Sequence, residues 1–361
     1  MQRRSREHYQ ACLLGGAVGD ALGASIEFLS LAEIRRRFGP AGLTDYAPAY
    51  GREGAITDDT QMTLFTAEAV LRGQNRARER GICSIKDVAR LAYFRWLKTQ
   101  GHEPPSESYE PGWLIGVKEL HSRRAPGNTC LSALEAGARG SRSKPQNDSK
   151  GCGAVMRMAP VGLVGGGLLD PFGDACRLGA LTHGHPSGFY SAGAFALIVH
   201  ALCDGKNLRD AAELACERLR AEGERASETC EALEGAIAFA GRGTPTPERL
   251  QSLGGGWVGE EALAIGLCCA LVAESFSDGA LLAVNHGGDS DSTGSIAGNL
   301  LGLIHGLEAI PASWLARLEL REVIAQVALD LWTHFGDGDL DARLTLDAHR
   351  RPSDWDRYPG N

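Results

Sequence analysis

The segment HGGDSDSTGSIAGNLLGLIHG, residues 286–306, joins an acidic, hydroxyl-rich start to an apolar helical pattern. From Ser292 onward its apolar residues recur at spacings of three and four, which is typical of one buried face of an α-helix. The same periodicity marks further stretches at 61–71, 85–97, 187–202, 208–220, 260–273 and 319–335. Because alternating, β-branched stretches are almost absent, the sequence predicts an all-α fold.

The chain's length and composition predict one large core. Of its 361 residues, 43% are hydrophobic, which is enough to bury a sizeable interior. Gly-rich and polar stretches at 101–111, 140–153 and 241–259 predict loops, but helical composition continues on both sides of each. We therefore predict a single domain, 1–361, with its core at about residues 8–335. The polar C-terminal tail, DAHRRPSDWDRYPGN, is expected to lie on the surface or to be partly disordered.

Charge and cysteine content restrict the partners. A net charge of -8 and a pI near 5.7 provide no strong basic field for nucleic acid. Ten cysteines without a CxxC pair indicate reduced thiols in a cytoplasmic protein. The start, MQRRSREHYQACLLGGAVGDALGA, resembles a signal peptide, but Asp20 interrupts its apolar stretch. The longest apolar run, 262–273, is too short to cross a bilayer. We expect no membrane partner, and a monomer is favoured.

Two clusters place hard oxygen ligands at the start of a predicted helix. The first is Ile56-Thr57-Asp58-Asp59-Thr60, before QMTLFTAEAVL, and the second spans 287–294 in the segment quoted above. Carboxylates and hydroxyls are the ligands that Mg²⁺ and Mn²⁺ prefer. Helix capping is the structural alternative, but capping needs one such residue. Crowded acids would repel unless a cation neutralised them, so the two clusters together predict a metal site.

Three weaker features also carry candidate site residues. Glu27 follows Asp20 by two helical turns within GGAVGDALGASIEF, 15–28, which would place both on roughly one helix face; close packing alone also explains that segment. Gly151, Cys152 and Gly153 form either a plain turn or a loop whose N–H groups suit a diphosphate. In the HxH of 183–185, ligand contact by His183 or plain hydrogen bonding is favoured over zinc. Serine-hydrolase, P-loop and Rossmann motifs do not stand out.

Taken in this order, the motifs resemble the ADP-ribosylglycohydrolase family, also called ADP-ribosyl-acceptor hydrolases. The matching blocks run from about residue 8 to residue 306 and are GGAVGDALGASIEF, ITDDTQMTLFTAEAV, APGNTCLSAL, KGCGAVMRMAPVGL, LTHGHPSG and HGGDSDSTGSIAGNLLG. TDDT together with GDSDSTGSIAGNLLGL is the most specific part. The resemblance implies a compact orthogonal helical bundle with a central cleft that holds two Mg²⁺ or Mn²⁺ ions.

The resemblance also implies roles for individual residues. Metal ligands are expected at Thr57, Asp58, Asp59, Asp289 and Asp291, with a hydroxyl from Ser292 or the neighbouring Thr293. Glu27 falls on a family glutamate near the metals that helps bind or activate at the scissile ribose. Substrate contacts are expected from Asn128 of the GNT motif, the phosphate-cradling loop Gly151, Cys152 and Gly153, and His183.

This chain departs from the family pattern at two places. Some members, notably those that act on ADP-ribosylated arginine, carry an Asp shortly before the GNT motif, where this chain has Arg123 and Arg124. The acceptor, whether arginine, serine, a nucleobase or a free metabolite, is therefore left open. Cys152 stands where an Asn is frequent, which changes the contacts that this loop can make.

The implied reaction is hydrolysis at the anomeric carbon of the terminal ribose, through an oxocarbenium-like state. Our hypothesis assigns catalysis to Glu27, Asp59 and Asp291. The two aspartates hold the ions, and Glu27 or a metal-bound water handles the proton. One alternative is a binder or neutraliser of ADP-ribosylated partners, or of an ADP-ribosylating toxin, without turnover. Another is a two-metal phosphohydrolase of a nucleotide diphosphate, which would release AMP or phosphate.

Overall fold

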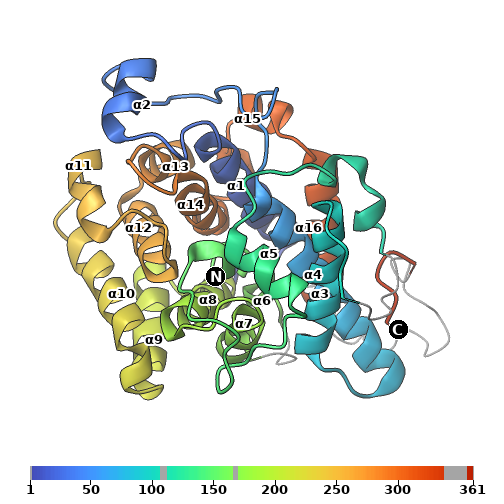
Figure 1. Cartoon of the computed structure of the whole chain (residues 1–361). Coiled ribbons are helices and arrows are strands. Elements are labelled where there is room, and N and C mark those ends of the chain that lie inside the picture. Colours follow the sequence, from blue (N-terminus) through green and yellow to red (C-terminus); the bar gives the residue numbers. More distant parts are fainter. Residues whose placement is uncertain (1, 106–111, 166–169, 337–355, 361) are drawn as a thin grey trace.

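The computed structural model describes residues 2–105, 112–165, 170–336 and 356–360 (Figure 1). The longer helices are α1 (Arg6–Gly23), α3 (Asp58–Arg80), α4 (Ile85–Thr99), α8 (Pro186–Cys203), α9 (Leu208–Ala221), α10 (Ser227–Ala240), α12 (Gly259–Val272), α14 (Ser290–His305) and α16 (Arg321–Phe335). The shorter ones are α2 (Leu31–Phe38), α5 (Asn128–Glu135), α6 (Ala159–Gly162), α7 (Pro171–Gly179), α11 (Pro247–Leu250), α13 (Phe276–Val284) and α15 (Ala312–Arg317). No β-strand forms within the described ranges, and the predicted all-α fold is confirmed.

Short 3₁₀ turns connect several of these helices. They are η1 (Leu114–Gly116), η2 (Lys118–Leu120), η3 (Cys152–Ala154), η4 (Glu224–Ala226), η5 (Gln251–Leu253) and η6 (Leu307–Ala309). Of these, η3 matters most for the candidate site because it contains Cys152 and Gly153 of the glycine loop predicted from the sequence.

The antiparallel pair α1 and α14 forms the centre of the fold (Figure 1). Gly15 lies against Gly298, and Gly19 against Gly294, so closely that a Cβ on any of the four would overlap its partner's carbonyl oxygen. Gly23, at the end of α1, lies against the first turn of α14 in the same way. Glycine at these positions allows the two backbones to touch. This close approach brings the C-terminal end of α1 beside the acidic start of α14.

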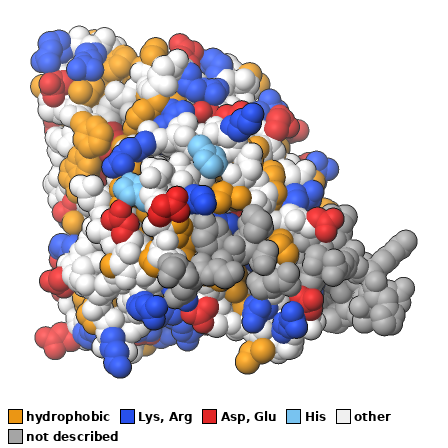
Figure 2. Space-filling model, turned by 45° about the vertical axis from the view of Figure 1, so that its right-hand side comes forward, with side chains coloured by type: hydrophobic (Ala, Val, Ile, Leu, Met, Phe, Trp, Pro, Cys, Tyr) orange, Lys and Arg blue, Asp and Glu red, His pale blue; other side chains and the backbone are white. Residues whose placement is uncertain are grey.

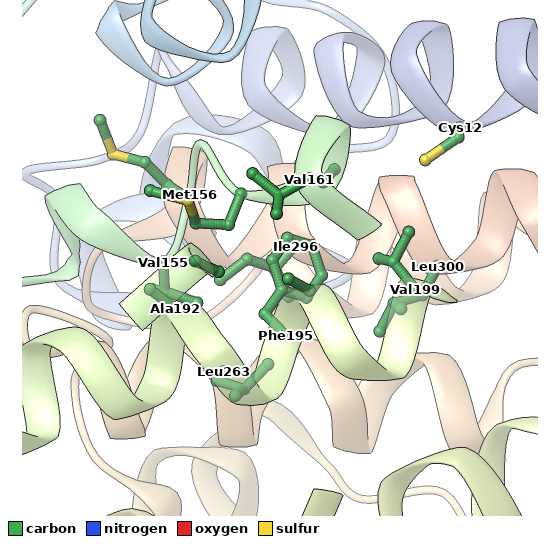
Figure 3. Packing of buried hydrophobic residues seen from close by; sticks show 14 of the residues in the cluster. Cys12, Val155, Met156, Val161, Ala192, Phe195, Val199, Leu263, Ile296 and Leu300 are labelled. Atoms are coloured by element: carbon green, nitrogen blue, oxygen red, sulfur yellow. The ribbon is translucent and has the colours of Figure 1, made fainter. Parts of the chain in front are cut away.

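The remaining helices pack around this pair. In Figure 1, α3, α4 and α16 lie on one side of α1, while α12 and α13 lie beside α14, with α9 and α10 farther out. Figure 3 shows one apolar layer in which Phe195 of α8, Leu263 of α12 and Ile296 of α14 meet Val155 and Val161. All five side chains are fully buried. This apolar layer anchors the start of α14, because Ile296 lies in α14 about one turn after the second acidic cluster.

All seven stretches with helical periodicity are helices in the structure. The stretch predicted at 61–71 is longer, extending over Asp58–Arg80, because polar residues continue the helix beyond the apolar pattern. The long helix α10 and shorter helices such as α7 and α13 were not predicted from periodicity. The loops predicted at 140–153 and 241–259 are irregular apart from η3, η5 and α11, and residues 106–111 of the first predicted loop lie outside the described residues.

Helix α8 is long and apolar enough to span a membrane by length and composition. However, 83% of that helix is buried inside the protein, where the apolar side chains pack against α7, α9 and α12.

On the face shown in Figure 2, basic side chains lie among acidic and apolar ones rather than in one continuous area.

Both ends of the described chain contact the core. Arg4, outside the predicted core of 8–335, forms a 2.6 Å ion pair with Asp204. Near the C-terminus, the buried Tyr358 accepts a 2.8 Å hydrogen bond from Asn75 at its carbonyl oxygen. The Arg357 guanidinium lies 2.7 Å from Asp330. The described end of the polar tail is therefore fastened to α3 and α16, while residues 337–355 lie outside the described part.

Candidate metal centre and substrate cavity

The first acidic cluster is built at the start of α3. Thr57 is the N-cap, and its hydroxyl accepts a 3.3 Å hydrogen bond from the Asp59 N–H. Asp20 of α1 accepts hydrogen bonds from the backbone N–H groups of Thr57, at 3.0 Å, and of Thr60, at 3.1 Å. The capping work is thus shared between Thr57 and Asp20. The Asp58 and Asp59 carboxylates are left available for another role.

The second acidic cluster is built at the start of α14. Asp289 is the N-cap residue, and its N–H donates to the Gly255 carbonyl at 2.8 Å. The Ser290 hydroxyl donates to the carbonyl oxygen of Gly23 at 3.0 Å. This bond ties the cluster to the end of α1. Asp291 follows in the first helical turn, where the positive end of the helix dipole favours a negative charge.

The two clusters meet across one cavity of about 660 Å³. Its walls include Glu27, Asp58, Asp59, Asn128, Gly151, Cys152, Gly153, His183, Asp289, Asp291 and Ser292. Carboxylate oxygens of Glu27, Asp289 and Asp291 lie within 4.8 Å of one another. The structure therefore brings eleven of the thirteen predicted site residues to one cavity. Thr57 and Thr293 do not line it.

Burial makes it energetically costly to ionise these carboxylates together unless a positive charge lies nearby. Loss of solvation, with repulsion from Asp291 as the next cause, raises the pKa of Asp58 and of Asp59 well above its usual value. Burial also raises the pKa of Asp289 and of Asp291. For Glu27 the same causes raise the pKa to about 11. A set of carboxylates that resist ionising together is the environment in which a divalent cation is most stabilising.

Two carboxylate oxygen atoms that lack a hydrogen-bond partner suit a bound cation. The Oδ1 atom of Asp59 and the Oε2 atom of Glu27 are buried and have no hydrogen-bond partner. Such groups ordinarily find a donor when buried, and an unsatisfied carboxylate oxygen is among the most costly. Both residues line the cavity. Since carboxylate oxygens are the ligands that Mg²⁺ and Mn²⁺ prefer, the residues present fit the predicted ions.

The three predicted hydroxyl ligands differ in position. Ser292 lines the cavity. The Thr293 hydroxyl instead lies 2.8 Å from His286 Nε2 and from the carbonyl oxygens of Ala283 and Asp289, inside the protein. Of the two hydroxyls that the sequence left open, Ser292 is therefore the one that faces the cavity. The Thr57 hydroxyl does not line the cavity, but it lies among the carboxylates, 3.4 Å from Asp59 Oδ2 and in contact with Asp291.

Glu27 reaches the cluster by a different route from the one predicted. Helix α1 ends at Gly23, so Glu27 does not share a helix face with Asp20, and that part of the prediction was wrong. The chain then turns through hydrogen bonds from the Ile26 N–H to the Gly23 carbonyl and from the Leu29 N–H to the Ile26 carbonyl, both 2.9 Å. The buried Ile26 side chain anchors the turn. Glu27 consequently lies over the cavity on a turn rather than on a helix.

The glycine loop, Gly151, Cys152 and Gly153, forms another part of the cavity wall. Gly151 makes an isolated β-bridge with Val258, and the Cys152 N–H donates to the Trp257 carbonyl at 3.2 Å. That N–H is therefore used within the protein and is not available to a diphosphate. A Cβ on Gly153 would lie 2.8 Å from the Cys130 sulphur. Glycine is required there because there is no space for a side chain.

His183 lies directly behind this loop. It is buried, and its Nδ1 lies 2.9 Å from the Thr182 hydroxyl. Burial, reinforced by the nearby Arg157 guanidinium, lowers the pKa of His183 to about 3. The ring is neutral at ordinary pH and can offer one nitrogen to a bound ligand.

The segment before α5 closes the cavity next to the first cluster. The Gly127 N–H donates to Asp58 Oδ2 at 3.3 Å, and the next residue, Asn128, begins α5 at the cavity wall. Arg124 is buried and lies 2.9 Å from Glu319. Arg123 lines the cavity. A cationic side chain thus stands at the cavity wall shortly before the GNT motif.

Two features of the site were not assigned from the sequence. Asp20 holds the start of α3, and burial together with repulsion from Asp291 raises its pKa to about 7. Phe28 and Trp257 stack at the cavity wall, with ring centroids 5.9 Å apart, although both are exposed large hydrophobic residues. An acid inside a Gly- and Ala-rich helix was a usable signal for Asp20. Nothing in the sequence pairs residue 28 with residue 257.

Comparisons with known proteins agree with this architecture. The model of the ADP-ribosylglycohydrolase family matches residues 1–340. The ADP-ribosyl-[dinitrogen reductase] glycohydrolase of Rhodospirillum rubrum is 26% identical over 323 residues, which cover 87% of this chain and 92% of that protein. The ADP-ribosylhydrolase ARH3 of Mus musculus is 24% identical, with 86% and 87% covered. A solved structure described as an ADP-ribosylglycohydrolase-related protein complex superposes with a TM-score of 0.60 at 26% identity, covering 92% of this chain and 99% of that one.

Proposed function

Because this chain belongs to the ADP-ribosylglycohydrolase family, we propose that it cleaves the glycosidic bond between ADP-ribose and a modified acceptor at a binuclear Mg²⁺ or Mn²⁺ centre. One observation carries the proposal: two acidic helix starts, far apart in the chain, share a single cavity with Glu27. A cavity of about 660 Å³ is in the range that encloses a small organic ligand.

In this proposal the ions are held by Asp58, Asp59, Asp289, Asp291 and the Ser292 hydroxyl. Bound ions of this kind bind sugar hydroxyls and lower the pKa of water. The Thr57 hydroxyl, next to Asp59 and in contact with Asp291, holds these two carboxylates in position. Asp20 holds the start of α3 in position by accepting hydrogen bonds from the N–H groups of Thr57 and Thr60.

Glu27 is the proposed proton carrier. Its carboxyl group lies near Asp289 and Asp291, and burial among acids favours its protonated form. A protonated carboxyl can donate to the oxygen or nitrogen that leaves the anomeric carbon as the bond breaks. Positive charge from the ions would lower the pKa of Glu27 toward the working range, so that this proton can be given up. The carboxylate left after the donation can then take a proton from the attacking water.

The opposite wall is proposed to hold the rest of ADP-ribose. Gly151 and Gly153 keep the backbone of the loop close to the ligand, and His183 supports the loop from behind. Asn128 offers an amide to the ribose or to the diphosphate. This arrangement leaves the acceptor on the side of Glu27 and Arg123.

The decisive experiment measures free ADP-ribose released from labelled substrates of defined linkage, with Mg²⁺ or Mn²⁺ and with chelator. We expect release that requires the cation and is abolished in Asp59→Ala and Asp291→Ala variants that keep their helical circular dichroism. Asp210→Ala is the matched control, because Asp210 also lies in the first turn of a helix but is exposed on α9. Undiminished release by either cavity variant, or in strong chelator, would refute the assignment.

The same assay separates the alternatives. A two-metal phosphohydrolase would release AMP or phosphate in place of ADP-ribose. A binder would retain the labelled substrate without turnover. A substrate panel with arginine, serine, nucleobase and free-metabolite acceptors identifies the linkage.

We also propose a cytoplasmic, monomeric protein. The support is that all ten cysteines are free thiols in the structure, which is the state expected in a reducing compartment. Size-exclusion chromatography with light scattering tests the oligomeric state.

A further inference from the structure

Cys152 is a thiol at the candidate metal centre. Its Sγ atom lies 2.7 Å from Oδ2 of Asp289, and both residues line the cavity. We propose that Cys152 makes this centre a binding site for a thiophilic divalent cation such as Zn²⁺, held by the Cys152 sulphur and Asp289 and competing with Mg²⁺ or Mn²⁺. This inference rests on the proposed metal centre and adds a soft ligand to it.

The distance between the two donor atoms suits a shared ion. Zinc binds thiolate sulphur at about 2.3 Å and carboxylate oxygen at about 2.1 Å, so two tetrahedral ligands of one ion stand roughly 3.6 Å apart. The Sγ and Oδ2 atoms, now in hydrogen-bond contact at 2.7 Å, need to separate by only about 1 Å.

Further oxygen ligands line the same cavity. Asp59 is 2% exposed, and its Oδ1 atom is buried without a hydrogen-bond partner. The Asp59 carboxylate acts electrostatically on the Cys152 thiol, and the Ser292 hydroxyl also interacts with it. The unpartnered Oδ1 therefore belongs to a carboxylate that lines the same cavity as the thiol and lacks a donor or a cation. Asp289 also lies within 4.8 Å of carboxylate oxygens of Glu27 and Asp291, so an ion held by Cys152 and Asp289 has further oxygen ligands beside Asp289.

Other thiols of the chain have different neighbours. Cys130 also lines the cavity, but its sulphur lies 3.5 Å from the Arg157 guanidinium, which repels a cation. Cys230 Sγ lies 3.4 Å from a Glu234 oxygen that is already paired with Arg220 at 2.6 Å. Cys230 therefore offers a thiol beside a carboxylate whose charge is already neutralised, which makes it a matched control.

Ligand softness determines which cations benefit. Mg²⁺ demands oxygen ligands in octahedral geometry, and sulphur contributes little to its binding, whereas thiolate ligands select Zn²⁺ and other soft ions. The thiol proton passes to solvent as the metal–sulphur bond forms. Replacing Cys152 by serine keeps the size and the hydrogen bond to Asp289 but removes the soft donor. Selectivity for Zn²⁺ over Mg²⁺ should therefore fall without a loss of Mg²⁺ binding.

The test uses the metal-free full-length protein and its Cys152→Ser and Cys230→Ser variants. Zn²⁺ affinity is measured by competition with a chromogenic chelator, and Mg²⁺ affinity by calorimetry. Titration with Cd²⁺ reports a metal–sulphur bond through its ultraviolet charge-transfer absorption. We expect Cys152→Ser to weaken Zn²⁺ binding at least about tenfold and to lose one equivalent of the cadmium band. Cys230→Ser should retain both.

Equal Zn²⁺ affinity and an undiminished cadmium band in Cys152→Ser would overturn the inference. Circular dichroism checks each fold, and Cys152→Asn, which restores the residue frequent in the family, provides a second variant with the same expectation. The two proposals fail separately. If Mg²⁺ still supports release of ADP-ribose while Zn²⁺ ignores Cys152, only this inference is wrong, whereas absence of any cation binding in all variants refutes the metal centre itself.

Discussion

Replacement of Gly298 by alanine tests whether the contact between α1 and α14 builds the metal centre. A Cβ on Gly298 would overlap the carbonyl oxygen of Gly15 and lie 2.7 Å from its carbonyl carbon. Ordinary contacts begin at 3.4 Å, so the helices must separate by at least 0.7 Å, the difference between these two distances. Backbone atoms block the methyl group, and no rotamer change relieves the overlap.

The expected cost follows from two opposing effects. Overpacking a tight core costs about 1–3 kcal/mol, and a backbone-to-backbone clash belongs near the upper end. Alanine in place of glycine within a helix returns about 1 kcal/mol. We therefore expect Gly298→Ala to lower the free energy of unfolding by about 2 kcal/mol. Metal sites tolerate ligand displacements of only about 0.2 Å, so Mn²⁺ binding should weaken by more than stability alone explains.

Gly235→Ala is the matched control. Gly235 lies inside α10, and an added Cβ there meets no atom within 4 Å. This variant should gain up to about 1 kcal/mol of stability from helix propensity and should bind Mn²⁺ as the unaltered protein does. The assay is urea unfolding followed by circular dichroism, with and without Mn²⁺, together with calorimetry of Mn²⁺ binding. A Gly298→Ala protein as stable as the unaltered one, with the same Mn²⁺ affinity, would show that the helix contact does not set the geometry of the centre.

Three further predictions concern groups that support the cavity. Asp20→Asn puts an amide donor where the Thr57 N–H now donates, so calorimetry should show Mn²⁺ binding weakened on the order of tenfold; unchanged affinity would contradict this role. Burial lowers the pKa of His183 from 6.5 to about 3, so its contribution to stability is present above pH 6.5 and is lost as the pH falls. Between pH 7 and pH 5 urea unfolding should register a loss of about 2 kcal/mol that His183→Gln lacks, and equal pH slopes would argue against it. Glu319→Ala leaves the Arg124 charge buried without this partner and should cost about 3–5 kcal/mol, whereas Glu319→Gln keeps a hydrogen bond and should cost less; a melting temperature unaffected by both would refute the ion pair's role.

The chemistry of the site was largely predictable from sequence because it is concentrated in two short blocks. Asp58, Asp59, Asp289 and Asp291 were recognised from residue type and from their position before a helical pattern. Both properties are local: the acids lie within one helical turn of each helix start, so periodicity and capping rules place them without knowledge of the fold. The long helices were predictable for the same reason.

Side-chain direction was less predictable. The sequence favoured Ser292, which directly follows Asp291, but left Thr293 open. In the structure consecutive helical residues face about 100° apart, and the neighbouring carbonyls and His286 hold the Thr293 hydroxyl inside the protein. The position of Glu27 was predicted on a helix that ends four residues earlier, at Gly23. Helix ends depend on tertiary contacts, here on the close approach of Gly23 to the start of α14.

By itself, the sequence determined the residue types of the centre, the helices that carry them and the family to which the chain belongs. Only the tertiary structure decided that the clusters meet, since 230 residues separate Asp59 from Asp289 and no local rule spans that distance. The physical reason is the contact of glycine with glycine between α1 and α14, which brings two backbones together and places Asp20 behind one cluster and Gly23 beside the other. Other tertiary contacts decided which hydroxyl faces the cavity and placed the Cys152 thiol next to Asp289.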